Sequence, residues 1–217
     1  MLTDDLFLRR AIVSASGLVY WIGVLIQARR VRRRIGRSPN LKPRGSKERL
    51  LWLGWFIVIL TWIFQPILLK SPSAGKSGLW TLDFGLWTLP AGLWSALLSP
   101  ITLAGGLVLV LGGYACTLWC YRAMGVSWRI GVNKSEKNAL VTVGPYRSIR
   151  HPIYGFQIVM LAGALLLIPT ILSLAILVFH FICVLVKAAD EEAYLLTVHG
   201  ESYREYLSRT GRLFPKL

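Results

Sequence analysis

The chain has 217 residues, of which 54% are apolar and only 16% are charged, and its mean hydropathy is +0.54. An ordinary soluble domain carries about 25% charged residues, so this composition excludes a soluble globular protein. The 25 Lys and Arg residues exceed the 10 Asp and Glu residues and give a formal net charge of +15. In a soluble protein such an excess would suggest nucleic-acid binding, whereas in a membrane protein it is typical of cytoplasmic loops. The three cysteines lie in apolar runs, which indicates no extracellular disulfide framework.

Five apolar segments predict an all-α integral membrane protein with about five transmembrane helices. A bilayer core about 30 Å thick needs about 20 helical residues. Three segments have this length, namely residues 11–28, 50–69 and 101–120. The uncharged run from Ile153 to Val186 is too long for one span, and Pro169 lies at its middle. Because proline interrupts a helix, the run predicts a hairpin of two antiparallel helices, 153–168 and 170–186.

The distribution of basic residues predicts the orientation. Loop 29–49 has ten Lys and Arg residues, loop 70–100 has two and loop 121–152 has six. The positive-inside rule therefore places the N-terminus outside and the C-terminus in the cytoplasm of a bacterial-type inner membrane. The ten-charge loop could instead bind nucleic acid or anionic lipid, but orientation alone accounts for it, and no nucleic-acid partner is predicted.

The loop 70–100 contains a seven-residue repeat that begins each time with Gly-Leu-Trp. If the segment is helical, Trp80, Trp87 and Trp94 share one face. Such a face is typical of a helix at the membrane interface, here over residues 78–98. The alternative is a substrate lid, although the predicted topology puts this segment on the side away from the polar motifs described next.

The third apolar segment contains two pairs of glycines seven residues apart. They are Gly105 with Gly106, and Gly112 with Gly113. Small residues at helical spacing let a neighbouring helix approach closely. The pattern therefore predicts helix packing and has no functional meaning of its own.

Most polar motifs lie after residue 130, in three clusters that the hairpin would bring to one membrane face. The first runs from Leu140 through Gly144-Pro145-Tyr146 to Arg150-His151-Pro152-Ile153-Tyr154, the second is Lys187 to Glu192, and the third is Gly200 to Tyr206. Because the hairpin returns the chain to its starting side, Arg150 and His151 are expected to meet Glu191 and Glu192. The hairpin therefore places cationic and acidic groups together at one membrane face.

In these motifs the sequence resembles the integral-membrane isoprenylcysteine carboxyl methyltransferases and their relatives, the phospholipid methyltransferases. The resemblance covers about residues 124–217 and rests on the order of Gly-Pro-Tyr at 144–146, Arg-His-Pro-x-Tyr at 150–154, Glu-Glu-x-x-Leu at 191–195 and Gly-x-x-Tyr-x-x-Tyr at 200–206. Two positions depart from the family pattern. His199 stands where an aromatic residue is usual, and Gly211 stands where a proline is usual.

The resemblance implies methyl transfer from S-adenosylmethionine to a lipophilic acceptor, either a prenylcysteine-like carboxylate or a lipid. The residues that it implies for cofactor binding are Asn138, Leu140, Val141, Tyr146, His151, Pro152, Ile153, Tyr154 and Glu191. Arg150 and Lys187 are the implied catalytic residues, and Lys187 stands where the family has a substrate-contacting arginine. Lysine keeps the charge of that arginine but lacks its two-pronged geometry.

The expected organisation is a transmembrane scaffold over residues 1–121 and a cofactor-binding core over residues 122–217, with the oligomeric state left open. Two other functions remain: a sterol-reductase-like enzyme that uses NADPH, and a membrane scaffold without turnover. A metal site built from Cys116, Cys120, His180 and Cys183 is possible by spacing. It is disfavoured because no carboxylate in the spans would support such ligands, and no metal is predicted.

Overall fold

The computed structural model describes residues 2–36, 45–68, 97–128 and 140–216. These residues form α1 (Leu2–Ile35), α2 (Ser46–Leu68), α4 (Pro100–Met124), α5 (Pro152–Leu167), α6 (Ile171–His199) and α7 (Glu201–Arg209), with short 3₁₀ turns η2 (Gly125–Ser127) and η3 (Gly144–Arg147). The described part of the chain contains no β-strand. The predicted Trp-rich helix at 78–98 lies largely outside the described residues.

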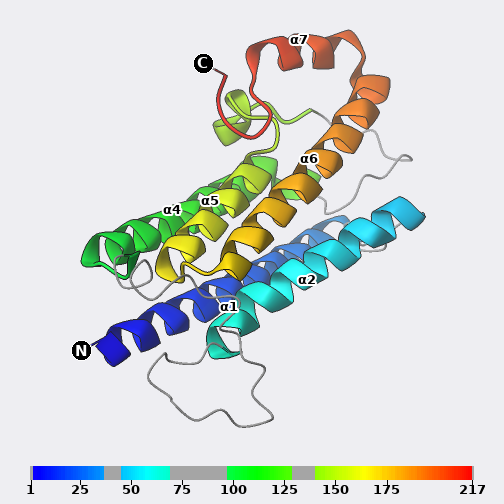
Figure 1. The fold of residues 1–217 in the computed structure, drawn as a ribbon. Helices are drawn as coiled ribbons and strands as arrows, with labels where there is room; N and C mark the ends of the chain where they lie inside the picture. The colour runs from blue at the N-terminus through cyan, green and yellow to red at the C-terminus, as the bar shows by residue number, and fades with distance from the viewer. Residues whose placement is uncertain (1, 37–44, 69–96, 129–139, 217) are drawn as a thin grey trace.

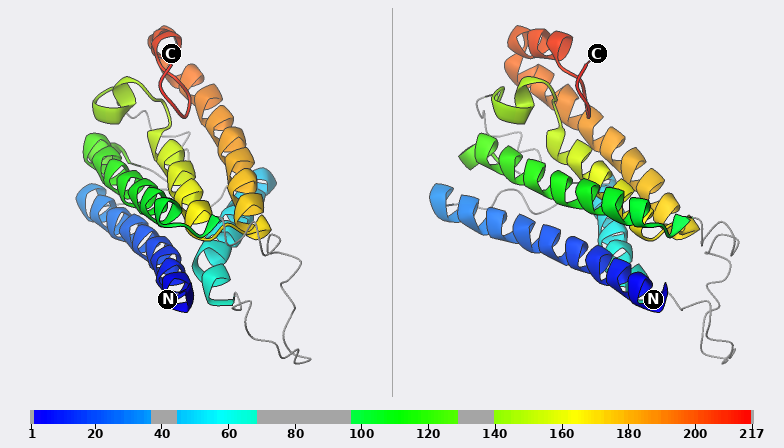
Figure 2. Two further views of the ribbon diagram at one scale, coloured as in Figure 1. Left: turned by 60° about the vertical axis from the view of Figure 1, so that its left-hand side comes forward. Right: turned by 90° about the vertical axis from the view of Figure 1, so that its left-hand side faces the viewer.

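The helices fit an all-α membrane protein. Four of them are long and apolar enough to cross a membrane, over Asp5–Ile35, Ser46–Leu68, Pro100–Ser127 and Ile171–His199, and α5 is a shorter apolar helix. The long helices lie beside one another, with the N-terminus at one end of the bundle and α7 with the C-terminus at the other (Figures 1 and 2). The prediction of about five spans, with the last two in a hairpin, is therefore confirmed.

The helices extend beyond the predicted membrane-spanning segments. α1 covers Leu2–Ile35 rather than 11–28, and α6 continues to His199 rather than ending at 186. The charged residues in these extensions favour helix and contain no glycine or proline to interrupt it. Each helix stops where a glycine takes a positive φ, at Gly36 (70°) and Gly200 (54°). Apolar length marks the part of a helix suited to lipid, whereas glycine sets where the helix ends.

Pro169 divides the long apolar run as predicted. α5 ends at Leu167 and α6 begins at Ile171. Thr170 caps α6, because its side-chain oxygen accepts a hydrogen bond of 2.9 Å from the backbone N–H of Ser173. On α2, the side chain of Gln65 donates hydrogen bonds to the hydroxyls of Thr170 and Ser173 and so ties the turn to that helix.

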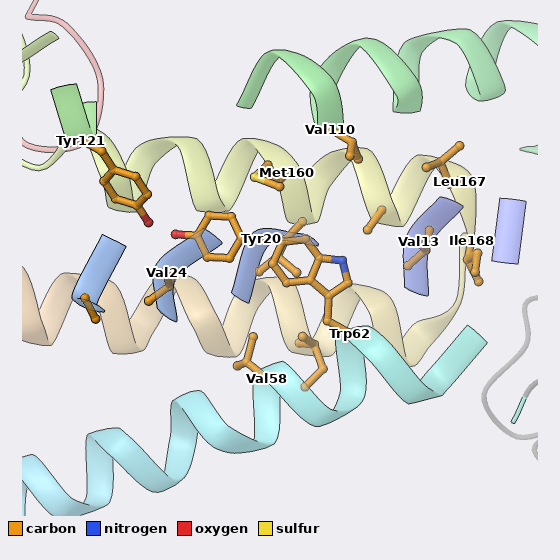
Figure 3. Packing of buried hydrophobic residues seen from close by; sticks show 14 of the residues in the cluster. Val13, Tyr20, Val24, Val58, Trp62, Val110, Tyr121, Met160, Leu167 and Ile168 are labelled. Carbon is orange, nitrogen blue, oxygen red and sulfur yellow. The ribbon is translucent and has the colours of Figure 1, made fainter. Parts of the chain in front are cut away.

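Buried aromatic and aliphatic side chains of α1, α2, α4 and α5 form the core (Figure 3). The ring of Tyr20 stacks on that of Trp62, with 5.8 Å between centroids. Gln157 Nε2 donates a 2.7 Å hydrogen bond to the Tyr20 hydroxyl, which points toward the hydroxyl of Tyr121. The first two helices are thus packed firmly against the segment that carries the polar motifs.

Two of the four glycines in α4 permit the predicted close approach of another helix. A Cβ at Gly106 would lie 2.9 Å from the carbonyl oxygen of Gly163, and one at Gly113 would lie 3.0 Å from that of Phe156. Both oxygens belong to α5. A Cβ at Gly105 would make only ordinary contact with Leu166 of α5, and one at Gly112 would meet nothing within 4 Å, so one residue of each glycine pair makes the close approach.

We expect Gly106→Ala to destabilise the protein by about 1–3 kcal/mol, because the new methyl group must push α4 away from α5. The measurement is the melting temperature of the detergent-purified variant. Gly112→Ala is the matched control, since a Cβ there meets nothing within 4 Å. Its melting temperature should be unchanged or slightly higher, and equal effects of the two variants would contradict the packing described here.

Candidate active site

The polar motifs come together at the end of the bundle that carries η3, α7 and the C-terminal tail (Figure 1). Backbone hydrogen bonds join the start of α5 to the tail: Arg150 N–H donates to the Gly211 carbonyl at 2.8 Å, and His151 N–H donates to the Arg212 carbonyl at 2.9 Å. Gly211 N–H donates to the Ser148 carbonyl at 3.0 Å. The tail therefore lies directly along residues 148–151.

The close approach of the tail depends on two glycines. A Cβ on Gly155 would overlap the carbonyl oxygen of Leu213, and a Cβ on Gly211 would overlap that of Phe214. A proline at 211, as the resembling family usually has, would not fit this backbone. The departure at Gly211 is thus explained by the local turn of the tail.

Glu192 binds the tail to the start of α5 through two arginines. Its Oε1 lies 2.9 Å from Arg150 Nε, and its Oε2 lies 2.6 Å from Arg212 Nη2. Arg150 also donates hydrogen bonds to the backbone carbonyls of Leu207 and Thr210. We call Arg150, Glu192 and Arg212 the tail clamp. Through it, the predicted catalytic Arg150 holds the tail beside His151.

Glu191, the neighbouring carboxylate, faces a different set of groups. Its Oε1 accepts a 3.0 Å hydrogen bond from the Tyr154 hydroxyl and lies 3.9 Å from Lys187 Nζ. Its Oε2 lies 3.4 Å from His151 Nδ1. The rings of His151 and Tyr154 stack, with 5.8 Å between centroids and 17° between planes. A carboxylate thus stands beside two stacked rings and one ammonium group.

His151 connects these two groups. Its Nδ1 faces Glu191, and its Nε2 lies 3.3 Å from Glu192 Oε1. Burial alone would lower the pKa of this histidine, but the two carboxylates overcome that effect and raise the pKa above its usual value. The site therefore favours the charged imidazolium form of His151.

Two residues of α2 join the site, and sequence reasoning missed both. Lys187 Nζ donates a hydrogen bond of 3.4 Å to Glu48 Oε1, and the ring of Trp55 lies 6.1 Å from that of Tyr154. Glu48 and Trp55 are seven residues apart in the sequence, which places them on one face of α2. The sequence did hold one signal, because Glu48 is the single acidic residue in the basic stretch 29–49.

Five of the predicted site residues take part in these contacts, namely Arg150, His151, Tyr154, Lys187 and Glu191. Tyr146, His151 and Pro152 are buried, and Leu140, Val141, Ile153 and Tyr154 are partly buried. The hydroxyl of Tyr206 donates a 2.6 Å hydrogen bond to the carbonyl of Tyr146, which packs α7 against η3. Asn138 lies outside the described residues, so its predicted role stays a prediction.

Among the residues that the structure describes, no group of three or more His, Cys, Asp or Glu side chains is arranged to hold a metal ion. His180 and Cys183 are buried on α6, and Cys120 is buried on α4. The described groups at the end of the bundle are instead carboxylates, cations and aromatic rings.

Curated relatives cover part of the chain. The nickel-cobalt-cadmium resistance protein NccN of Alcaligenes xylosoxydans xylosoxydans is 30% identical over 57% of this chain and 52% of its own length. The cobalt-zinc-cadmium resistance protein CzcN of Cupriavidus metallidurans is 29% identical over 55% of this chain and 51% of its own length. The chain thus spans about half the length of the curated relatives that it matches.

A family model also matches the chain. Residues 101–202 match the model described as phospholipid methyltransferase. The matched segment includes α4, α5, α6 and the start of α7, and with them the residues from Arg150 to Tyr154 and from Lys187 to Glu192. This segment, slightly less than half of the chain, is therefore similar to the phospholipid methyltransferase family.

Proposed function

We propose that the protein transfers a methyl group from S-adenosylmethionine to a lipophilic acceptor at the cytoplasmic face of the membrane. The observation that carries the proposal is the group around Glu191, with its carboxylate against the stacked His151 and Tyr154 rings, inside the segment that matches the family. A prenylcysteine-like carboxylate and a membrane lipid are the two acceptor classes considered.

The donor set around Glu191 fits this cofactor. A sulfonium cation suits the carboxylate of Glu191 and the faces of Tyr146 and Tyr154, because both attract positive charge, whereas the charged His151 suits the carboxylate at the amino-acid end of the cofactor. Glu191, Tyr154, His151 and Tyr146 would bind it, together with Pro152, Ile153, Leu140, Val141 and Asn138. When bound, S-adenosylmethionine supplies a methyl group on an electron-poor sulfur. An NADPH-dependent reductase finds no corresponding support in the family match.

Methyl transfer requires alignment of the two reactants and exclusion of water more than acid–base groups. Lys187 is almost fully buried, with 5% of its surface exposed, and lies one helical turn from Glu191. We assign it to orientation of the acceptor. Arg150 acts indirectly, through the tail clamp. The clamp fixes the backbone next to His151 and keeps that side of the site closed.

Equilibrium binding of S-adenosylhomocysteine to the detergent-purified protein tests the proposal, with NADPH measured in parallel. Saturable binding of S-adenosylhomocysteine without binding of NADPH is the expected result. Asp190→Asn is the control variant: this carboxylate adjoins Glu191 in sequence but pairs on the surface with Lys47, so its replacement should leave the affinity unchanged. Binding of NADPH alone, or of neither ligand, would overturn the proposal.

A further inference from the structure

Two ion pairs of different character connect α2 with α6. Lys47 Nζ lies 2.7 Å from Asp190 Oδ1, with side chains 66% and 42% exposed. Lys187 Nζ lies 3.4 Å from Glu48 Oε1, with side chains 6% and 21% exposed. An exposed pair contributes little to stability, whereas the charge of a buried lysine must be compensated. The pair inside the site is therefore the one that can influence what binds there.

Glu48 changes what Lys187 can offer to an incoming molecule. An unpaired buried ammonium would attract a carboxylate strongly, but here Glu48 accepts a hydrogen bond from it and Glu191 lies 3.9 Å away. A second anion at this lysine would have to displace Glu48 or approach two carboxylates. An amine can instead be shared between those carboxylates.

A second observation places the edge of α2 at a binding region. The indole Nε1–H of Trp55 is buried and has no hydrogen-bond partner among the described residues, while its ring contacts the ring of Tyr154. Buried donors are usually paired, so this unpaired donor indicates a place where a polar group of a bound lipid other than its amine, such as an ester carbonyl, supplies the acceptor.

We propose that Glu48 is a specificity-determining residue of the acceptor site: by pairing with Lys187, it makes the site favour a lipid carrying an amine over a lipid carrying a free carboxylate. The inference rests on the proposed function where that places Lys187 at the acceptor. It adds to the site a residue of α2, which lies outside the segment that matches the family.

The test compares two probes that share one alkyl chain, tetradecylamine and tetradecanoate, binding to the purified protein in a neutral detergent near pH 7. The measured quantity is the ratio of the Kd of the carboxylate to the Kd of the amine. We expect a ratio above one for the natural sequence. Glu48→Gln should lower the ratio by about tenfold or more, because Lys187 then lacks its nearest counter-charge.

Asp190→Asn is the matched control, since it removes the same single negative charge from the exposed pair between the same two helices. It should leave the ratio unchanged. Lys187→Gln provides a second measurement if Glu48→Gln does not fold; it leaves the carboxylates without their ammonium group and should raise the ratio.

An unchanged ratio in Glu48→Gln, an equal shift in Asp190→Asn, or a ratio that does not rise in Lys187→Gln would each overturn the proposal. S-adenosylhomocysteine binding, measured on the same samples, keeps the two proposals apart. Its failure in the natural protein would reject the proposed methyl transfer, while the probe ratio would still decide whether Glu48 selects by charge.

Discussion

Replacing Glu192 with alanine is expected to destabilise the protein by about 3–5 kcal/mol, because the change removes one partner of a buried ion pair and leaves the other without compensation. Arg150 is 11% exposed at its side chain and lies 2.9 Å from the lost carboxylate. Arg212 and His151 lose the same neighbour. The melting temperature of the purified protein measures the loss.

The loss should be concentrated in the tail. Hydrogen exchange of the backbone N–H groups of Arg150 and His151, which donate to the tail carbonyls of Gly211 and Arg212, should become faster than exchange in α4. Glu201→Ala is the control, since Glu201 forms an exposed pair with Arg204 at 3.0 Å and its loss should cost less than about 1 kcal/mol. Similar losses in the two variants would show that the tail clamp does not hold the tail.

The number and order of the membrane helices could be predicted because apolar length and one proline determine them. Pro169 has an effect that depends only on its own backbone, so the hairpin was predictable from the sequence. The ends of α1 and α6 were not, because charged residues continue a helix as readily as apolar ones do. The apolar pattern showed which part of each helix suits lipid, whereas the glycines that end these helices, Gly36 and Gly200, lie beyond the apolar part.

The meeting of Arg150 and His151 with Glu191 and Glu192 also followed from the hairpin. The different partners of the two glutamates could not be predicted from the hairpin. Adjacent residues on a helix point about 100° apart, and only packing decides which groups each one contacts. Glu192 faces the arginines of the tail clamp, whereas Glu191 faces Tyr154 and Lys187.

The contribution of α2 depends on contacts between residues about a hundred or more positions apart. Glu48 and Lys187 are separated by 139 positions in the sequence. No local motif connects them, and a single sequence contains no record of such a pairing. A lone acid in a basic stretch is a weak signal that gains meaning only when the fold places it beside a buried lysine.

Glu191→Gln is expected to weaken binding of S-adenosylhomocysteine by about 10–100-fold, because a hydrogen bond to a charged group contributes about 1.5–3 kcal/mol. Glutamine keeps the size of the side chain and removes the charge that faces Lys187 and His151. Equilibrium binding measures the change in affinity, and thermal unfolding shows whether the protein remains folded.

The comparison with Glu192→Ala makes this prediction specific. Glu191→Gln should lower affinity at a nearly unchanged melting temperature, since Glu191 takes no part in the tail clamp and its side chain is 20% exposed. Asp190→Asn should change neither quantity, because that carboxylate lies on the surface with Lys47. If Glu191→Gln bound the ligand as tightly as the natural protein, Glu191 would not belong to the cofactor site, and the aromatic pair of His151 and Tyr154 would have to bind it without a carboxylate.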